Sequence, residues 1–188
     1  DFILEKGNAY GVDMVLKYDY KKIYVYAVYS LGYVTRQFEN NAGEMVSYTP
    51  HFDRRHNVNL VFSYITGAKR QWEFGARWNL GTGFPFTQVQ GFNESLTFPG
   101  GVNSNYVTEN GNLGVIYADM YKGRLPVYHR LDIDVKRNFF FSANTKLVAD
   151  LSVTNVYDRK NVFYVDLITS EVVYQLPFMP SFGLSLYF

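Results

Sequence analysis

The sequence predicts an all-β fold, in which antiparallel strands cross a membrane as part of a transmembrane β-barrel. Three observations favour it. Apolar and polar residues alternate in segment after segment, and these segments run about nine to eleven residues, the length of a tilted membrane strand. Short and long connections alternate between them, as in barrels with tight turns on one side and long loops on the other.

Seven segments are the expected crossings, at about 9–20, 23–34, 54–66, 70–80, 128–141, 145–157 and 178–188. In "YGVDMVLKYDY" the even-numbered residues are apolar and oppose a set that includes Asp13 and Lys17. The second segment is apolar on both faces and gives a weaker signal. In "HNVNLVFSY" the even positions are again apolar, with Val61 the exception on the other face.

The later segments repeat the pattern. "QWEFGARWNL" has apolar residues at even positions and "RLDIDVK" has them at odd positions. "KLVADLSVT" follows the same rule as "RLDIDVK", and "FMPSFGLSLYF" alternates up to the last residue of the chain. Apart from the second segment and isolated exceptions such as Val61 and Val148, each segment therefore has one apolar and one polar or small face, as a strand between two unlike environments requires.

The connections are short at 21–22, 66–69 and 142–144, and long at 35–52, 81–127 and 158–176. The longest contains "GTGFPF", "FPGGVNSN" and "ENGNLG", which suit irregular backbone exposed to water. A phosphate-binding loop at "GTGFPF" is the alternative, but it lacks the usual Lys and following helix. We expect ligand contacts at loop tips, above all between Thr87 and Tyr121.

Composition argues against several functions. The 18 Lys and Arg nearly balance the 17 Asp and Glu, unlike a nucleic-acid binder that relies on a basic surface. The chain has no Cys, and its three His lack the helical spacing of a zinc site, so we expect no metal and no cofactor. Aromatic residues reach 19% of the 188 residues, which suits many half-buried positions.

Alternation alone does not separate a membrane barrel from a soluble sandwich, since the apolar face meets lipid in one and a core in the other. Aromatic residues near segment ends favour the membrane, because aromatic girdles lie at its two interfaces. The expected interfacial aromatics are Tyr18, Tyr20, Trp72 and Trp78.

The charged residues of the strands are expected to face a polar lumen. They are Asp13, Lys17, Glu73, Arg77, Arg130, Asp132, Asp134, Lys136 and Asp150. Acid–base catalysis by Asp132 and Asp134 is the alternative to a charge-balanced ladder. Arg54 and Arg55, where a long loop returns to the membrane, either brace the loop base or meet ligand or anionic lipopolysaccharide.

Seven crossings with short periplasmic turns put the C-terminus in the periplasm and residue 1 outside. A complete bacterial barrel has an even strand number and both termini in the periplasm. We therefore expect residues 1–188 to be the C-terminal segment of a larger barrel.

Five stretches together resemble the C-terminal barrel of TonB-dependent outer-membrane receptors of the Bacteroidetes type. They are "FDRRHNVNLVFSY", "FGARWNLGTGFPFT", "GRLPVYHRLDIDVKR", "SVTNVYDRKNVFY" and "LPFMPSFGLSLYF". The resemblance implies a barrel of about 22 strands, closed by an N-terminal plug. It also implies a non-enzymatic receptor that takes up a scarce solute, such as a metal chelate or an oligosaccharide.

The resemblance further implies partners. These are outer-membrane lipid and lipopolysaccharide, an inner-membrane energy-coupling complex reached through the plug, and a possible surface lipoprotein. The last strand resembles the signal read by the barrel assembly machinery, carried by Phe178, Phe182, Leu184, Leu186 and Phe188.

Three alternatives stay open. A complete eight-stranded barrel, acting as an adhesin or membrane enzyme, needs another crossing within Asp1 to Asn8. A soluble β-sandwich binding module folds without detergent. An incomplete barrel held as a client by the assembly machinery pairs through its last strand.

Overall fold

The computed structural model describes residues 4–40, 42–95, 112–142, 144–166, 169 and 171–188. Within these ranges the regular secondary structure consists of β-strands. No helix long and apolar enough to span a membrane is found there. Every strand pairing in these ranges is antiparallel. The prediction of an antiparallel all-β fold is thus confirmed.

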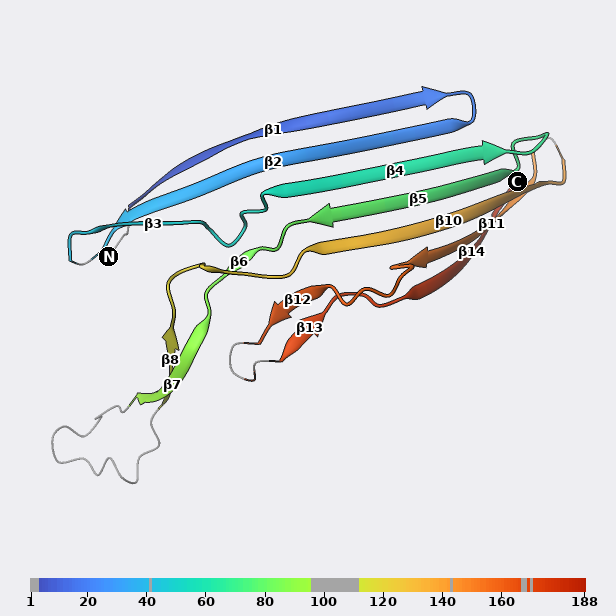
Figure 1. Ribbon diagram of the computed structural model, residues 1–188. Coiled ribbons are helices and arrows are strands. Elements are labelled where there is room, and N and C mark those ends of the chain that lie inside the picture. The colour runs from blue at the N-terminus through green and yellow to red at the C-terminus, as the bar shows by residue number, and fades with distance from the viewer. Residues whose placement is uncertain (1–3, 41, 96–111, 143, 167–168, 170) are drawn as a thin grey trace.

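One sheet contains the seven segments that alternation predicts as strands, side by side in chain order (Figure 1). The strands are β1 (Glu5–Tyr20), β2 (Ile23–Glu39), β4 (His56–Thr66), β5 (Trp72–Gly81), β10 (Tyr128–Phe140), β11 (Lys146–Thr154) and β14 (Met179–Tyr187). The first two are the longest, at 16 and 17 residues, and exceed the predicted segments.

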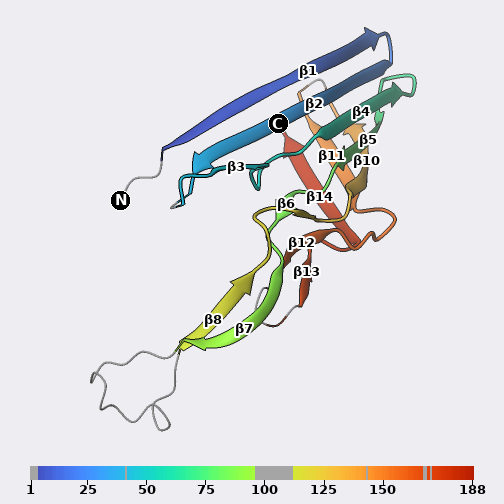
Figure 2. The same cartoon turned by 60° about the vertical axis from the view of Figure 1, so that its left-hand side comes forward.

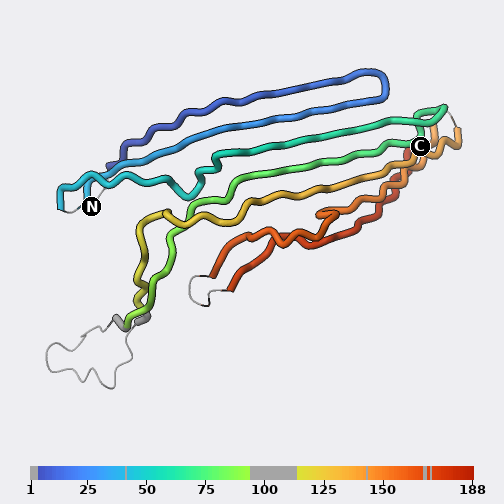
Figure 3. Tube along the Cα trace, in the orientation of Figure 1, coloured from blue at the N-terminus to red at the C-terminus, as the bar shows by residue number. Residues whose placement is uncertain are grey.

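Tight turns join the strands at one end of the sheet, which we call the turn end. Tyr20 pairs with Ile23 around Lys21, whose φ is 55°. Gly67 has a φ of 96°, in the left-handed region that glycine enters without steric cost. The path of the chain in Figure 3 runs back and forth between this end and the opposite one, the loop end, from which the long connections leave.

The long connections at the loop end contain short strands, so the described part of the 81–127 connection is more regular than expected. These strands are β3 (Met45–Tyr48) beside β2, β6 (Pro85–Phe86) with β9 (Gly123–Arg124), β7 (Val89–Ser95) with β8 (Asn112–Tyr117), and β12 (Val162–Val165) with β13 (Val172–Tyr174). The β7–β8 hairpin projects away from the main sheet (Figure 2). The "FPGGVNSN" motif lies outside the described residues, as does the middle of the predicted ligand loop, 96–111.

The main sheet is open. Among the described residues, β1 pairs with β2 alone and β14 pairs with β11 alone. These residues therefore form no closed barrel. The eight-stranded alternative lacks the pairing between first and last strands that closure requires.

The register gives the sheet two unlike faces. Directly paired residues of neighbouring antiparallel strands lie on the same face. One row of the apolar face contains Leu16, Ala27, Leu60, Trp78 and Leu131. The adjacent row of the polar face contains Lys17, Tyr26, Val61, Arg77 and Asp132.

The apolar face has no second layer over it within the described part of the chain. None of the Ala, Val, Leu, Ile, Met, Phe, Tyr or Trp residues described there is buried. Leu16 is 63% exposed and Phe182 is 65% exposed. A soluble sandwich needs a packed core between two sheets, so the described residues do not fit that alternative.

Candidate functional site

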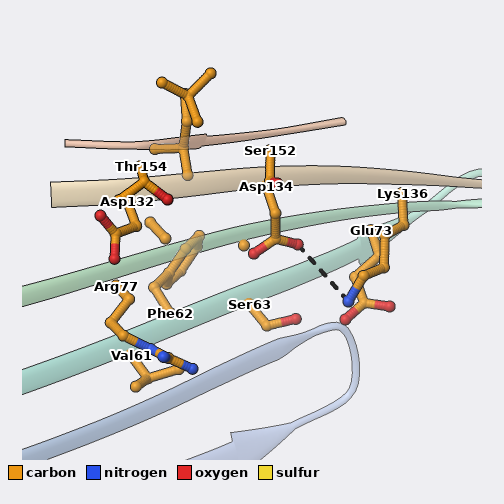
Figure 4. A pocket seen from close by; sticks show the side chains of 14 residues that line it. Val61, Phe62, Ser63, Glu73, Arg77, Asp132, Asp134, Lys136, Ser152 and Thr154 are labelled. Atoms are coloured by element: carbon orange, nitrogen blue, oxygen red, sulfur yellow. Dashed lines mark ion pairs between the residues drawn. The ribbon is translucent and has the colours of Figure 1, made fainter. Parts of the chain in front are cut away.

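Most of the predicted lumen-facing charges gather in the middle of the polar face. Glu73, Lys136 and Asp150 share one row across β5, β10 and β11, while Arg77 pairs with Asp132. A shallow hollow of about 370 Å³ lies here, and Figure 4 shows charged side chains from β5 and β10 around it. The charged residues that line it are Glu73, Arg77, Asp132, Asp134 and Lys136.

The remaining predicted charges lie on the same face but outside the hollow. Arg130 is in the row of Asn79 and Asn59, nearer the loop end. Asp13 and Lys17 lie on β1, at the edge of the sheet. The structure therefore joins one central cluster, which Arg130 contacts through Asp132, and leaves Asp13 and Lys17 apart from it.

Two carboxylates of the cluster, those of Asp132 and Asp134, form ion pairs. Arg130 Nη2 lies 2.9 Å from Asp132 Oδ2, and Lys136 Nζ lies 3.9 Å from Asp134 Oδ2 (Figure 4 shows the second pair). This arrangement fits a charge-balanced ladder in contact with water better than a catalytic acid and base. In the described ranges no three His, Asp or Glu side chains come together as metal ligands.

A second site lies at the loop end, around Asp53. Its side chain is 2% exposed, and Oδ1 accepts a hydrogen bond of 3.1 Å from the amide of Val34. Arg124 Nη2 lies 2.6 Å from Oδ2, and Arg55 Nε lies 3.7 Å from it. Asp53 thus connects β2 to β9 and to the residues that precede β4. The sequence analysis did not identify Asp53, because Val34 and Arg124 are far from it along the chain.

The two predicted loop-base arginines have different surroundings. Arg55 pairs with Asp53 and lies 5.3 Å from the ring centre of Tyr33, which favours bracing. The Arg54 guanidinium lies 4.4 Å from the ring centre of Phe84 and 5.6 Å from that of Tyr128. Burial lowers the pKa of Arg54 from its ordinary value, because desolvation disfavours the charged form.

Asn155, after β11, organises the last long connection. It is fully buried with φ at 55°, a conformation that Asn tolerates better than most residues. Its Nδ2 donates to the carbonyls of Arg159 and Leu176, both at 3.0 Å, and Oδ1 accepts from the Arg159 amide. Its own amide donates to Asp132 Oδ1 at 3.0 Å, which links the connection to the polar cluster.

The side chain of Asn161 makes the hydrogen bonds that a neighbouring strand would otherwise make with the start of β10. Its Oδ1 accepts from the amide of His129 at 3.2 Å, and its Nδ2 donates to the His129 carbonyl at 2.9 Å. The side chain is 3% exposed. This amide pair satisfies backbone groups of β10 beyond the point where β11 ends.

Tyr48 on β3 forms a hydrogen-bonded group with Glu5 of β1 and Arg36 of β2 at the loop end. Its hydroxyl donates to Glu5 Oε1 at 2.9 Å, and Arg36 Nη1 donates to Glu5 Oε2 at 3.0 Å. Burial raises the pKa of Tyr48, and the hydrogen bond to Glu5 raises it further. The first strand is thereby fastened to β3 across β2.

An aromatic pocket of about 360 Å³ lies among the loop-end strands. Rings line it from several connections: His51, Phe86, Tyr117, Tyr121, Phe163 and Tyr164. The amide of Tyr121 donates to Thr87 Oγ1 at 3.0 Å, which fixes the base of the β7–β8 hairpin. Both ends of the predicted ligand segment, Thr87 and Tyr121, thus belong to this pocket.

The predicted lipid-facing residues lie on the apolar face of the sheet or next to its last strand. Phe182, Leu184 and Leu186 of β14 are each more than half exposed, Phe188 follows the strand, and the amide of Phe178 donates to Asp158 Oδ1. Tyr18, Tyr20 and Trp72 lie toward the turn end, and Trp78 lies nearer the loop end. Their contact with lipid stays a prediction.

Comparisons of the chain with protein-family models, with curated proteins and with solved structures gave no match, so its function is inferred from its own residues.

Proposed function

We propose that this chain is the C-terminal part of the barrel of an energy-coupled, TonB-dependent outer-membrane receptor. Such a receptor takes up a scarce solute, such as a metal chelate or an oligosaccharide. The observation that carries the proposal is the main sheet, whose seven long strands have an exposed apolar face and a charged opposite face.

The apolar face supports a lipid environment. Large apolar side chains are exposed on it from the first strand to the last, among them Leu16 at 63%, Leu151 at 54% and Phe182 at 65%. Contiguous apolar surface of this kind is rare on soluble monomers. Lipid would cover it without any second protein layer.

The polar face supports a water-filled lumen. Charge is inexpensive there, whereas Lys or Arg at the bilayer midplane costs roughly 2–4 kcal/mol. The pairing of Arg130 with Asp132 and of Lys136 with Asp134 favours polar contacts to water and to a plug over catalysis.

The two open edges support a larger barrel. Unpaired strand edges at β1 and β14 would promote aggregation unless further strands cover them. The folded loop end would then face the exterior and receive the solute, while the turn end, where β14 finishes, would face the periplasm. Lipopolysaccharide, the assembly machinery, the coupling complex and a surface lipoprotein are the partners that this reading implies.

Heat-modifiable migration of the full-length protein in detergent gels tests the barrel, and fractionation tests the outer-membrane location. Uptake should stop when the energy-coupling complex is removed, while binding at the cell surface should persist. A water-soluble, protease-resistant monomer of residues 1–188 would refute the proposal.

A further inference from the structure

Arg54 is a cation without an anion. Within the described part of the chain its guanidinium makes no ion pair and no hydrogen bond, and its Nε is buried without a partner. The nearby Arg55 and Arg124 both lie close to Asp53. The rings of Phe84 and Tyr128 hold the Arg54 side chain in position, yet they leave its charge unneutralised.

A gap in the polar face accommodates this guanidinium. Gly81 sits between Asn57 and Tyr128 in one row across β4, β5 and β10. A Cβ on Gly81 would come within 2.5 Å of the Arg54 Nε and Cζ atoms, far closer than any real contact. Glycine at this position therefore lets Arg54 lie against the sheet.

Uncharged amides surround the gap. A hollow of about 270 Å³ is lined by Arg54, Asn57, Asn59, Asn79, Leu80, Tyr128 and Gln175. Four of these residues carry side-chain amides, which donate and accept hydrogen bonds. Arg54 is the single charged residue of that lining, in contrast to the paired charges in the middle of the face.

We propose that this hollow binds one carboxylate of a polyhydroxylated solute. The Arg54 guanidinium holds the carboxylate, because its planar fork matches the two oxygens. The amides of Asn57, Asn59 and Asn79 hydrogen-bond to the hydroxyl groups. One unpaired positive charge balances one monoanion, which favours a carboxylate over a doubly charged phosphate.

This site deepens the proposed function by naming a class of solute, and it rests on that function only for access from the exterior. Two kinds of molecule share the chemistry: acidic sugars and hydroxycarboxylates. Binding to the full-length protein in detergent micelles is measured by calorimetry with galacturonate, with its methyl ester and with gluconate, two polyhydroxylated monoanions and one uncharged control. We expect galacturonate or gluconate to bind, and the uncharged ester to bind at least about tenfold more weakly than its acid.

Two variants test the role of Arg54. Arg54→Gln should weaken binding of the acid about ten- to a hundredfold and leave binding of the ester unchanged. Gly81→Ala keeps every charge but displaces the guanidinium, and it should weaken acid binding in the same direction. The matched control is Lys122→Gln, which removes an exposed positive charge at the loop end outside the hollow and should leave affinity unchanged.

Heat-modifiable migration of each variant verifies that it is folded. Equal affinity for the acid and its ester would overturn the proposal, as would full affinity in Arg54→Gln or no binding of either carboxylate probe. These results would leave the barrel and the uptake assays untouched, so failure of this site and failure of the proposed function are distinguishable.

Discussion

The sheet and its loop end are stabilised in opposite ways. In the sheet, strand ladders carry apolar side chains that nothing in the described chain covers, such as Leu184 at 60% exposure. At the loop end, the fully enclosed side chains among the described residues include Asp53 and Asn155, and these are polar. In the proposed membrane location a surrounding apolar phase would cover the sheet, whereas the loop end is held by its own hydrogen bonds.

The largest effect on stability is expected from a charge placed on the apolar face of the sheet, compared with the same charge on the polar face. Phe62→Lys puts a charge on the apolar face and should destabilise the protein in lipid vesicles by about 2–4 kcal/mol. The matched control is Ser63→Lys on the polar face, in the row of Asp134, which should cost less than about 1 kcal/mol. Urea unfolding of the full-length protein in vesicles measures both, and equal costs would contradict a lipid-facing surface.

The second-largest effect is expected at Asn155, whose substitution should destabilise the last long connection of the loop end. Asn155→Ala removes three side-chain hydrogen bonds and leaves buried backbone groups unpaired, which should cost about 2–3 kcal/mol locally. Faster hydrogen exchange at the Arg159 amide measures the loss. Asn144→Ala, the same change at an exposed position of the turn end, is the control and should leave this exchange unaltered.

The strands of the sheet were more predictable from the sequence than the contacts of the loop end. The seven strands were predictable because alternation depends on residues only two apart, as in the run from Leu131 to Val135. The polar cluster followed from the same rule, since residues of one parity share a face. Alternation does not decide whether a barrel closes, because closure would need further strands paired with β1 and β14.

The loop end was less predictable because its contacts join distant residues. Asp53 meets Arg124, which is 71 residues later, and no local pattern announces that pairing. Strands β7 and β8 are separated by 16 residues in the chain, and no local pattern in that stretch predicts that they pair. Asn155 offered the best signal, because Asn directly after a strand often adopts a left-handed turn conformation.

A smaller effect should appear at the contact between Asp53 and Arg124. Asp53→Asn keeps an acceptor for the Val34 amide but removes the charge, and should cost about 1–2 kcal/mol. A double-mutant cycle with Arg124→Gln, read by urea unfolding, isolates the pair. Additive costs would show that the 2.6 Å contact contributes no coupling.

The smallest effect concerns pH. The pKa of Tyr48 is raised above its ordinary value of 10.0, chiefly by burial, so the folded state favours the neutral phenol. The stability from this residue is full below about pH 10 and is lost as pH rises through the folded-state pKa. The ultraviolet titration difference between the native protein and Tyr48→Phe should therefore have its midpoint above 10; a midpoint at or below 10 would contradict this.

The fastening of the β7–β8 hairpin has an evolutionary consequence. The Tyr121 amide donates to Thr87 Oγ1, and the Ala118 amide donates to the Gln88 carbonyl at 2.9 Å, so the hairpin is secured at its root. Substitutions in the described parts of the hairpin beyond this root, 90–95 and 112–116, should therefore disturb the strands below less than substitutions at the root itself. Natural selection, or an engineer, could then vary the hairpin while the main sheet stays unchanged.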